Sequence, residues 1–137
     1  MKKITEITVE EVIRINAAIC SQYREPHLLR DQHTLQSAIE VGAFYRFPDG
    51  RYAQGGVASI AGTMCYKIAQ AQAFLNGNKR TAYLSAKAFL GLNGFELRYP
   101  QGDLESLIYG FAGPPGAPKV SIEDAKEWFQ THTYRIT

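Results

Sequence analysis

The chain has 137 residues, so one ordinary domain with a single buried core is expected to span residues 1–137. Its net charge of +2, with 20% charged residues, does not favour an extended polyanionic partner, and direct nucleic-acid binding is therefore not expected. No apolar stretch approaches the ~20 residues of a membrane span, and the first residues turn acidic before any apolar run. The sequence thus favours a soluble, cytoplasmic protein without a membrane partner.

The two cysteines, Cys20 and Cys65, favour the same compartment. Each lies inside an apolar stripe of helical spacing, and neither has the spacing of a metal site or a disulfide framework. We therefore interpret both as buried free thiols, which a reducing cytoplasm permits.

Two helices are predicted in the first third of the chain. Thr8 stands three residues before Glu11, which indicates a capping box, and the helix that it starts must end before Pro26. The residues that recur along one face of this helix are Val9, Val12, Ile13, Asn16, Cys20 and Tyr23. A second, shorter helix is expected over residues 34–41.

The stretch 44–52 has the composition of a small β-hairpin, because aromatic residues flank Pro-Asp-Gly. Proline presets the turn and glycine supplies a positive φ. The alternative is a surface loop whose aromatic side chains pack downward. The candidate hairpin residues are Phe47, Asp49, Gly50, Arg51 and Tyr52.

Two apolar helices are predicted in the middle of the chain. From residue 55 onward apolar residues recur at spacings of three and four, and the same spacing reaches Gln72, whose side chain should then point inward. Residues 78–93 are apolar on most sides, which predicts a buried helix at the centre of the bundle.

The last part of the chain is expected to hold a short strand and two more helices. Residues 95–99 alternate apolar and polar side chains, and residues 103–111 have one apolar face. A capping residue, Ser121, starts a last helix in which Trp128 and Phe129 anchor the core. Together these elements indicate an all-α bundle of about six helices with a small β-hairpin.

The turn between the two middle helices, residues 72–81, is the candidate functional site, and we call it the anion loop. The free N–H groups of the helix that follows, and its macrodipole of about half a positive charge, favour phosphate there before any basic side chain adds its charge. The alternative is ordinary turn chemistry, in which Asn76 and Gly77 make the turn, Asn78 caps the helix and the basic side chains face solvent.

The anion loop resembles the signature of the Fic/Doc family, and within it the Doc (death-on-curing) branch, whose pattern reads His-x-Phe-x-Asp/Asn-Ala/Gly-Asn-Lys-Arg-Thr-Ala. The matching residues are Phe74, Asn76, Gly77, Asn78, Lys79, Arg80, Thr81 and Ala82. Residues 30–31 and 35–38 also look like runs common in Doc-like proteins, so the resemblance covers most of the chain. It implies a compact Fic-type bundle in which the hairpin is a flap that aligns a target segment by strand addition.

The resemblance implies an enzyme that transfers part of an NTP, bound with Mg²⁺, to a hydroxyl of a target protein. Most Fic enzymes transfer AMP, whereas Doc toxins transfer the terminal phosphate and resemble kinases of elongation factor Tu. Lys79 favours the Doc branch, because the AMP-transferring pattern has glycine there and a second arginine at the position of Tyr83.

The resemblance also assigns roles to the residues of the anion loop. Asn76 holds the divalent cation, weakly because an amide oxygen is a poorer ligand than a carboxylate. Gly77 and Asn78 bind the phosphates together with Lys79 and Arg80, and the two cations neutralise the charge that builds on the transferred group. The loop anchor is Phe74.

Gln72 departs from the pattern, because it stands where the family has the histidine that takes the proton from the attacking hydroxyl. An amide only orients a hydroxyl, so transfer should fall by about 10²–10⁴-fold, and the sequence places neither His27 nor His33 at the site. Three explanations stay open: a natural variant that tolerates the loss of a base, a catalytically inactive nucleotide- or partner-binding protein, or a substitution made to suppress toxicity.

A toxin activity would need a restraint, and the family's inhibitory Ser/Thr-x-x-x-Glu-Gly/Asn motif is matched only in part. Ser21 and Glu25 have its spacing, but Pro26 follows them. We therefore expect inhibition in trans by an antitoxin, a segment of which lies across the anion loop.

Overall fold

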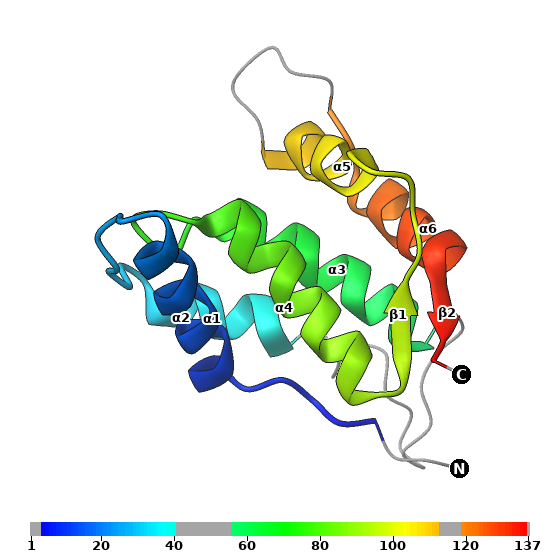
Figure 1. The fold of residues 1–137 in the computed structure, drawn as a ribbon, viewed down its shortest axis with the longest axis horizontal. Coiled ribbons are helices and arrows are strands. Elements are labelled where there is room, and N and C mark those ends of the chain that lie inside the picture. The colour runs from blue at the N-terminus through cyan, green and yellow to red at the C-terminus, as the bar shows by residue number, and fades with distance from the viewer. Residues whose placement is uncertain (1–3, 41–55, 113–118, 137) are drawn as a thin grey trace.

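The computed structural model describes residues 4–40, 56–112 and 119–136 (Figure 1). In these ranges the chain forms six helices and one small sheet, which confirms the predicted all-α class. The elements are α1 (Val9–Gln22), α2 (Gln32–Ile39), α3 (Gly56–Ala71), α4 (Asn78–Leu92), β1 (Phe95–Leu97), α5 (Asp103–Ala112), α6 (Ile122–His132) and β2 (Thr133–Arg135). Among the described helices, none has the length and hydropathy of a membrane span.

Helix α3 is the centre of the bundle, with α2, α4, α5 and α6 packed around it. Figure 1 shows α3 and α4 side by side, with α1 and α2 at one end and α5 and α6 along the other face. Helices α3 and α6 pack closely at Gly62, where a Cβ would lie only 2.9 Å from the carbonyl oxygen of Ala125. The absence of a side chain at Gly62 permits this close approach. The prediction that residues 78–93 are the central helix was therefore wrong, since α3 is buried on more sides.

The helix starts follow local capping chemistry. The side chains of Thr8 and Glu11 form the predicted capping box of α1. The carboxylate of Asp31 accepts hydrogen bonds from the N–H and hydroxyl of Thr34, so α2 begins at Gln32, two residues earlier than predicted. These bonds lower the pKa of Asp31, because they favour its charged form.

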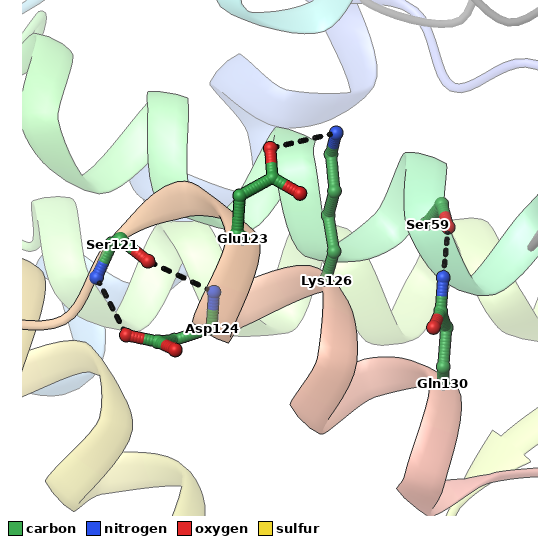
Figure 2. A network of polar contacts seen from close by, with 6 residues as sticks. All are labelled: Ser59, Ser121, Glu123, Asp124, Lys126 and Gln130. Carbon is green, nitrogen blue, oxygen red and sulfur yellow. Dashed lines mark hydrogen bonds and ion pairs between the residues drawn. The ribbon is translucent and has the colours of Figure 1, made fainter.

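Helix α6 carries the second capping box, formed by Ser121 and Asp124 (Figure 2). Further along α6, Gln130 Nε2 donates to Ser59 Oγ at 2.6 Å and so ties this helix to the start of α3. Figure 2 also shows the Glu123–Lys126 ion pair, at 3.4 Å, on the same helix. The core anchor predicted at residue 129 is fully buried.

The predicted strand at residues 95–99 is present as β1, but its partner was not predicted. β1 pairs antiparallel with β2, which follows α6 directly, and Glu96 faces Tyr134 in the register. The hairpin predicted at residues 44–52 lies outside the described residues.

Both cysteines are buried free thiols, as predicted. Burial raises the pKa of the Cys65 thiol well above its ordinary value, and desolvation with the nearby Glu25 charge raises the pKa of Cys20. Neither thiol therefore ionises readily in the folded protein.

Candidate functional site

Main-chain hydrogen bonds join the anion loop to the segment between α1 and α2. The carbonyl oxygen of Ala73 accepts the N–H of Arg30 at 2.6 Å, and the N–H of Leu75 donates to the carbonyl of Leu28 at 2.9 Å. Between them, Phe74 and Leu29 form an antiparallel bridge. These main-chain bonds join two segments more than 40 residues apart and fix the path of the loop.

Phe74 lies fully buried beneath the loop, in the place expected of an anchor. The side-chain amide of Asn78 closes the loop around it, because its Oδ1 accepts the Phe74 N–H at 3.1 Å and its Nδ2 donates to the Phe74 carbonyl at 2.8 Å. Asn78 is thus the first residue of α4 and not its N-cap. The N-cap is Gly77, whose φ of 76° is a left-handed conformation that glycine adopts without strain.

Among the described residues no side chain caps α4, because its N-cap residue, Gly77, has no side chain. The N–H groups of the first turn are therefore left for an external acceptor, and the positive end of the helix macrodipole faces the same way. This arrangement is the physical basis of anion binding at a helix start.

The start of α4 opens into a cleft of about 640 Å³ between the anion loop, the end of α3 and α5. The predicted site residues that line it are Gln72, Asn76, Gly77, Asn78, Lys79 and Arg80. Five further residues complete the lining, namely Ala69, Leu75, Tyr83, Glu105 and Ile108. The volume lies in the range of small-molecule sites, so a nucleotide is of suitable size.

The two basic residues at the cleft are held by aromatic rings. The Arg80 guanidinium lies 4.0 Å from the ring centre of Tyr23, and Lys79 Nζ lies 5.6 Å from that of Tyr109. Within the described ranges neither residue forms an ion pair, so both charges are available to an anion. The expectation that these side chains serve an anion and not a structural salt bridge is compatible with this geometry.

Gln72 lies at the end of α3 with a φ of 47°, which is the left-handed region and is strained for a side-chain-bearing residue. Its carbonyl accepts a hydrogen bond from Arg30 Nη2 at 3.0 Å. The prediction that the apolar stripe of the third helix continues to Gln72 was wrong, because the helix ends at Ala71 and Gln72 is exposed. Gln72 is nevertheless one of the residues that line the cleft beside the loop.

Neither histidine near the second helix replaces the missing base. His27 Nδ1 lies 2.8 Å from Asn16 Oδ1, and the centres of the His27 and Phe74 rings are 6.1 Å apart. None of these three residues lines the cleft. His33 is an exposed residue of α2 and also lies outside the lining. Among the described residues, the only titratable acid at the cleft is Glu105.

A divalent cation finds few protein ligands at this cleft. Asn76 Nδ2 donates to the Pro26 carbonyl at 3.1 Å, which leaves Oδ1 as the atom able to bind a cation. No group of three His, Cys, Asp or Glu side chains suited to a metal occurs in the described part of the chain. The residues therefore fit a cation that takes most of its ligands from phosphate and water, as Mg²⁺ does.

Several residues at the site were not identified from the sequence. Asn16 and Tyr23 were assigned only to the face of the first helix that packs on the core. The polar side chain of Asn16 on this mainly apolar face was the one sign in the sequence of a further role. Glu105 and Tyr109 lie on α5, about thirty residues after the loop, and nothing in their local sequence connects them to it.

These features define a helical domain with a candidate anion site where an uncapped helix start opens into a cleft. The family model described as Fic/DOC family matches residues 6–90, which is more than half of the chain, so the chain belongs to the Fic/DOC family. The match includes the anion loop and ends in the last turn of α4. The family supports a function of the NTP-transfer type, usually with Mg²⁺. A comparison with curated proteins gave no match.

Proposed function

We propose that this protein is a Doc-like toxin that binds an NTP in the cleft and transfers its terminal phosphate to a hydroxyl of a target protein. The observation that carries the proposal is the uncapped start of α4, which opens into a cleft of about 640 Å³ beside Lys79 and Arg80. The Doc branch, and phosphate transfer over AMP transfer, rest on the resemblance at Lys79 and Tyr83, and both residues line the cleft.

The polyphosphate is expected to lie across the first turn of α4. Its oxygens accept hydrogen bonds from the main-chain N–H groups of residues 78–80, while Lys79 and Arg80 balance the charge of the transferred group. Mg²⁺ bound with the nucleotide would add charge neutralisation, and Asn76 Oδ1 is the protein atom that would hold it, since Asn76 Nδ2 is bonded to the Pro26 carbonyl. Removing one such electrostatic contact typically lowers kcat by about 10²–10³-fold.

In the proposed transfer Gln72 orients the attacking hydroxyl without taking its proton. The hydroxyl oxygen bonds to the terminal phosphorus as the bond from that phosphorus to the bridging oxygen breaks, the nucleoside diphosphate leaves, and the hydroxyl proton passes to an oxygen of the transferred phosphate or to water. Transfer remains possible because phosphoryl transfer passes through a loose transition state in which the nucleophile gains little positive charge before the bond to the leaving group breaks. We expect a slow enzyme, below a histidine-containing variant by about 10²–10⁴-fold.

An inactive nucleotide- or partner-binding protein is the second candidate. The observation that favours it is that no histidine lines the cleft among the described residues, so the usual proton acceptor is lacking. This candidate shares the anion site and differs only in the absence of chemistry.

One assay separates the two candidates. The wild-type protein and the Gln72→His variant are incubated with γ-labelled or α-labelled ATP and a bacterial lysate. Protein-bound γ-label with both forms supports the proposal, and α-label would instead indicate AMP transfer. Label with the variant alone, in an assay sensitive enough to detect a rate about 10⁴-fold lower, or with neither form while calorimetry detects nucleotide binding, would establish the inactive protein.

The partners proposed for this protein are an antitoxin acting in trans and a cytoplasmic target protein, with elongation factor Tu as the first to test. Within the described residues, Glu25 follows the end of α1, and its N–H bonds the Cys20 carbonyl at 2.8 Å, so it does not lie on an inhibitory helix. The purified chain should therefore bind nucleotide without any activating step, as calorimetry would detect. The proposed flap residues 47–52 lie outside the described ranges, and their role in target docking rests on the resemblance alone.

A further inference from the structure

Asn16 is a fully buried polar residue in the middle of α1, and all of its hydrogen-bonding capacity is used. Its Nδ2 donates to the Asn76 carbonyl at 2.8 Å and to Thr81 Oγ1 at 2.9 Å. Its Oδ1 lies 2.8 Å from His27 Nδ1 and 3.5 Å from Cys20 Sγ. Because the Asn76 carbonyl can only accept, the orientation of the Asn16 amide is fixed, and His27 must donate through Nδ1.

The two acceptors of the Asn16 amide stand on either side of the turn that begins α4. Asn76 immediately precedes Gly77, and Thr81 closes the first helical turn through its N–H to the Gly77 carbonyl at 2.8 Å. Gly77 also packs directly on Asn16, because a Cβ at this glycine would lie 3.2 Å from Asn16 Nδ2. One amide group therefore supports both ends of the segment whose N–H groups face the cleft.

Asn76 is held at two points by the part of the chain around α1. Its carbonyl is bonded to Asn16 and its side-chain Nδ2 to the Pro26 carbonyl. With both groups occupied, the remaining Oδ1 has a defined position. An aspartate at residue 76 would have no N–H for Pro26, so the chain's own geometry favours the amide at this position.

We propose that Asn16 is a positioning residue of the anion site. It sets the separation of Asn76 and Thr81, and so aims the first-turn N–H groups of α4 and the Asn76 amide at the bound polyphosphate. This inference rests on the proposed function for its ligand, although the geometry that it assigns to the loop can be measured without any ligand. Substituting Asn16 should weaken nucleotide binding by more than the accompanying loss of fold stability explains.

The test compares Asn16→Asp with a matched control, Val12→Ala. Aspartate keeps the shape and the acceptor toward His27, but it replaces the donor toward Asn76 and Thr81 by an oxygen. Val12 is fully buried one turn earlier on the same helix, and its loss lowers stability without removing a bond to the loop. Each protein is measured well below its melting temperature, by ATP–Mg²⁺ calorimetry and by hydrogen exchange of the amides of residues 77–81.

The expected result is that Asn16→Asp binds ATP about tenfold more weakly and exchanges the loop amides faster, whereas Val12→Ala retains both properties of the wild type. The deficit of Asn16→Asp should shrink on acidification, because a protonated carboxyl regains one donor. The inference would be overturned if Asn16→Asp had the same amide exchange rates and ATP affinity as the wild type. It would also be overturned if Val12→Ala lost as much ATP affinity and amide protection as Asn16→Asp. If the wild type binds no nucleotide, the proposed function fails, and the exchange comparison alone then decides the role of Asn16.

Discussion

The Arg80 guanidinium lies 4.0 Å from the centre of the Tyr23 ring, where the end of α1 meets the first turn of α4. A cation–π contact at an exposed site stabilises by about 0.5–1 kcal/mol, which is enough to favour one position of a long side chain. Lys79 is held in the same way against Tyr109 of α5. Two helices that are distant in sequence thus fix the two cations that flank the cleft.

Replacing Tyr23 by leucine should weaken nucleotide binding by about three- to fivefold, because Arg80 loses the ring that holds it near the cleft. The matched control is Tyr134→Leu, which removes a similar contact, because the Arg98 guanidinium lies 5.0 Å from the centre of the Tyr134 ring. Tyr134 and Arg98 are far from the loop in sequence and do not line the cleft. Calorimetry with ATP and Mg²⁺ measures both variants. Equal affinities for the two variants would show that the ring plays no part in binding.

Arg80→Ala should lower nucleotide affinity by about tenfold or more and any phosphate transfer by about 10²–10³-fold, because a charge aimed at the polyphosphate is removed. Stability should fall by no more than about 1 kcal/mol, since the side chain is exposed and loses only its cation–π contact with Tyr23. Arg98→Ala is the control, an exposed arginine paired with Glu96 at 2.9 Å and absent from the cleft lining. Affinity unchanged by Arg80→Ala would exclude this residue from the site.

Asn78→Ala should destabilise the fold by about 1–3 kcal/mol and also weaken nucleotide binding, because the N–H and carbonyl of Phe74 lose their partner and the loop opens. Asn93→Ala offers a control of similar chemistry, since Asn93 bonds both the N–H and the carbonyl of Thr5. Urea unfolding and calorimetry should show a stability loss in both variants and a binding loss only in Asn78→Ala. Loss of binding in both would mean that stability alone governs the site.

Stability should fall as the pH rises into the alkaline range, because burial raises the pKa of Cys65 above that of an unfolded thiol. Its contribution is fully present below the unfolded pKa of about 8.5 and is lost as the pH rises toward the folded pKa. Urea midpoints at pH 7 and pH 9.5 measure the effect. Cys65→Ala should be less stable than the wild type at pH 7, but its urea midpoint should change less between pH 7 and pH 9.5. If the midpoint of this variant changes as much as that of the wild type, other groups cause the effect.

The sequence was most informative where the controlling interactions are local. The capping boxes at Thr8 and Ser121 act over three residues, so the starts of α1 and α6 could be read directly from the pattern. Asn78 shows where local reasoning fails. The alternative interpretation of the turn made Asn78 the cap of the helix. In the structure the oxygen and the nitrogen of its side-chain amide both bond to the main chain of Phe74, and Gly77 is the N-cap.

The sequence by itself determined the helical class, the two middle helices and the loop between them, because periodicity and turn chemistry are encoded within a few neighbouring residues. Only the tertiary structure decided what surrounds that loop: the bridge to residues 28–31, the amide of Asn16 beneath it, and Glu105 and Tyr109 of α5 beside it. Contacts of this kind depend on how helices far apart in the chain pack against each other, and no local pattern specifies that packing.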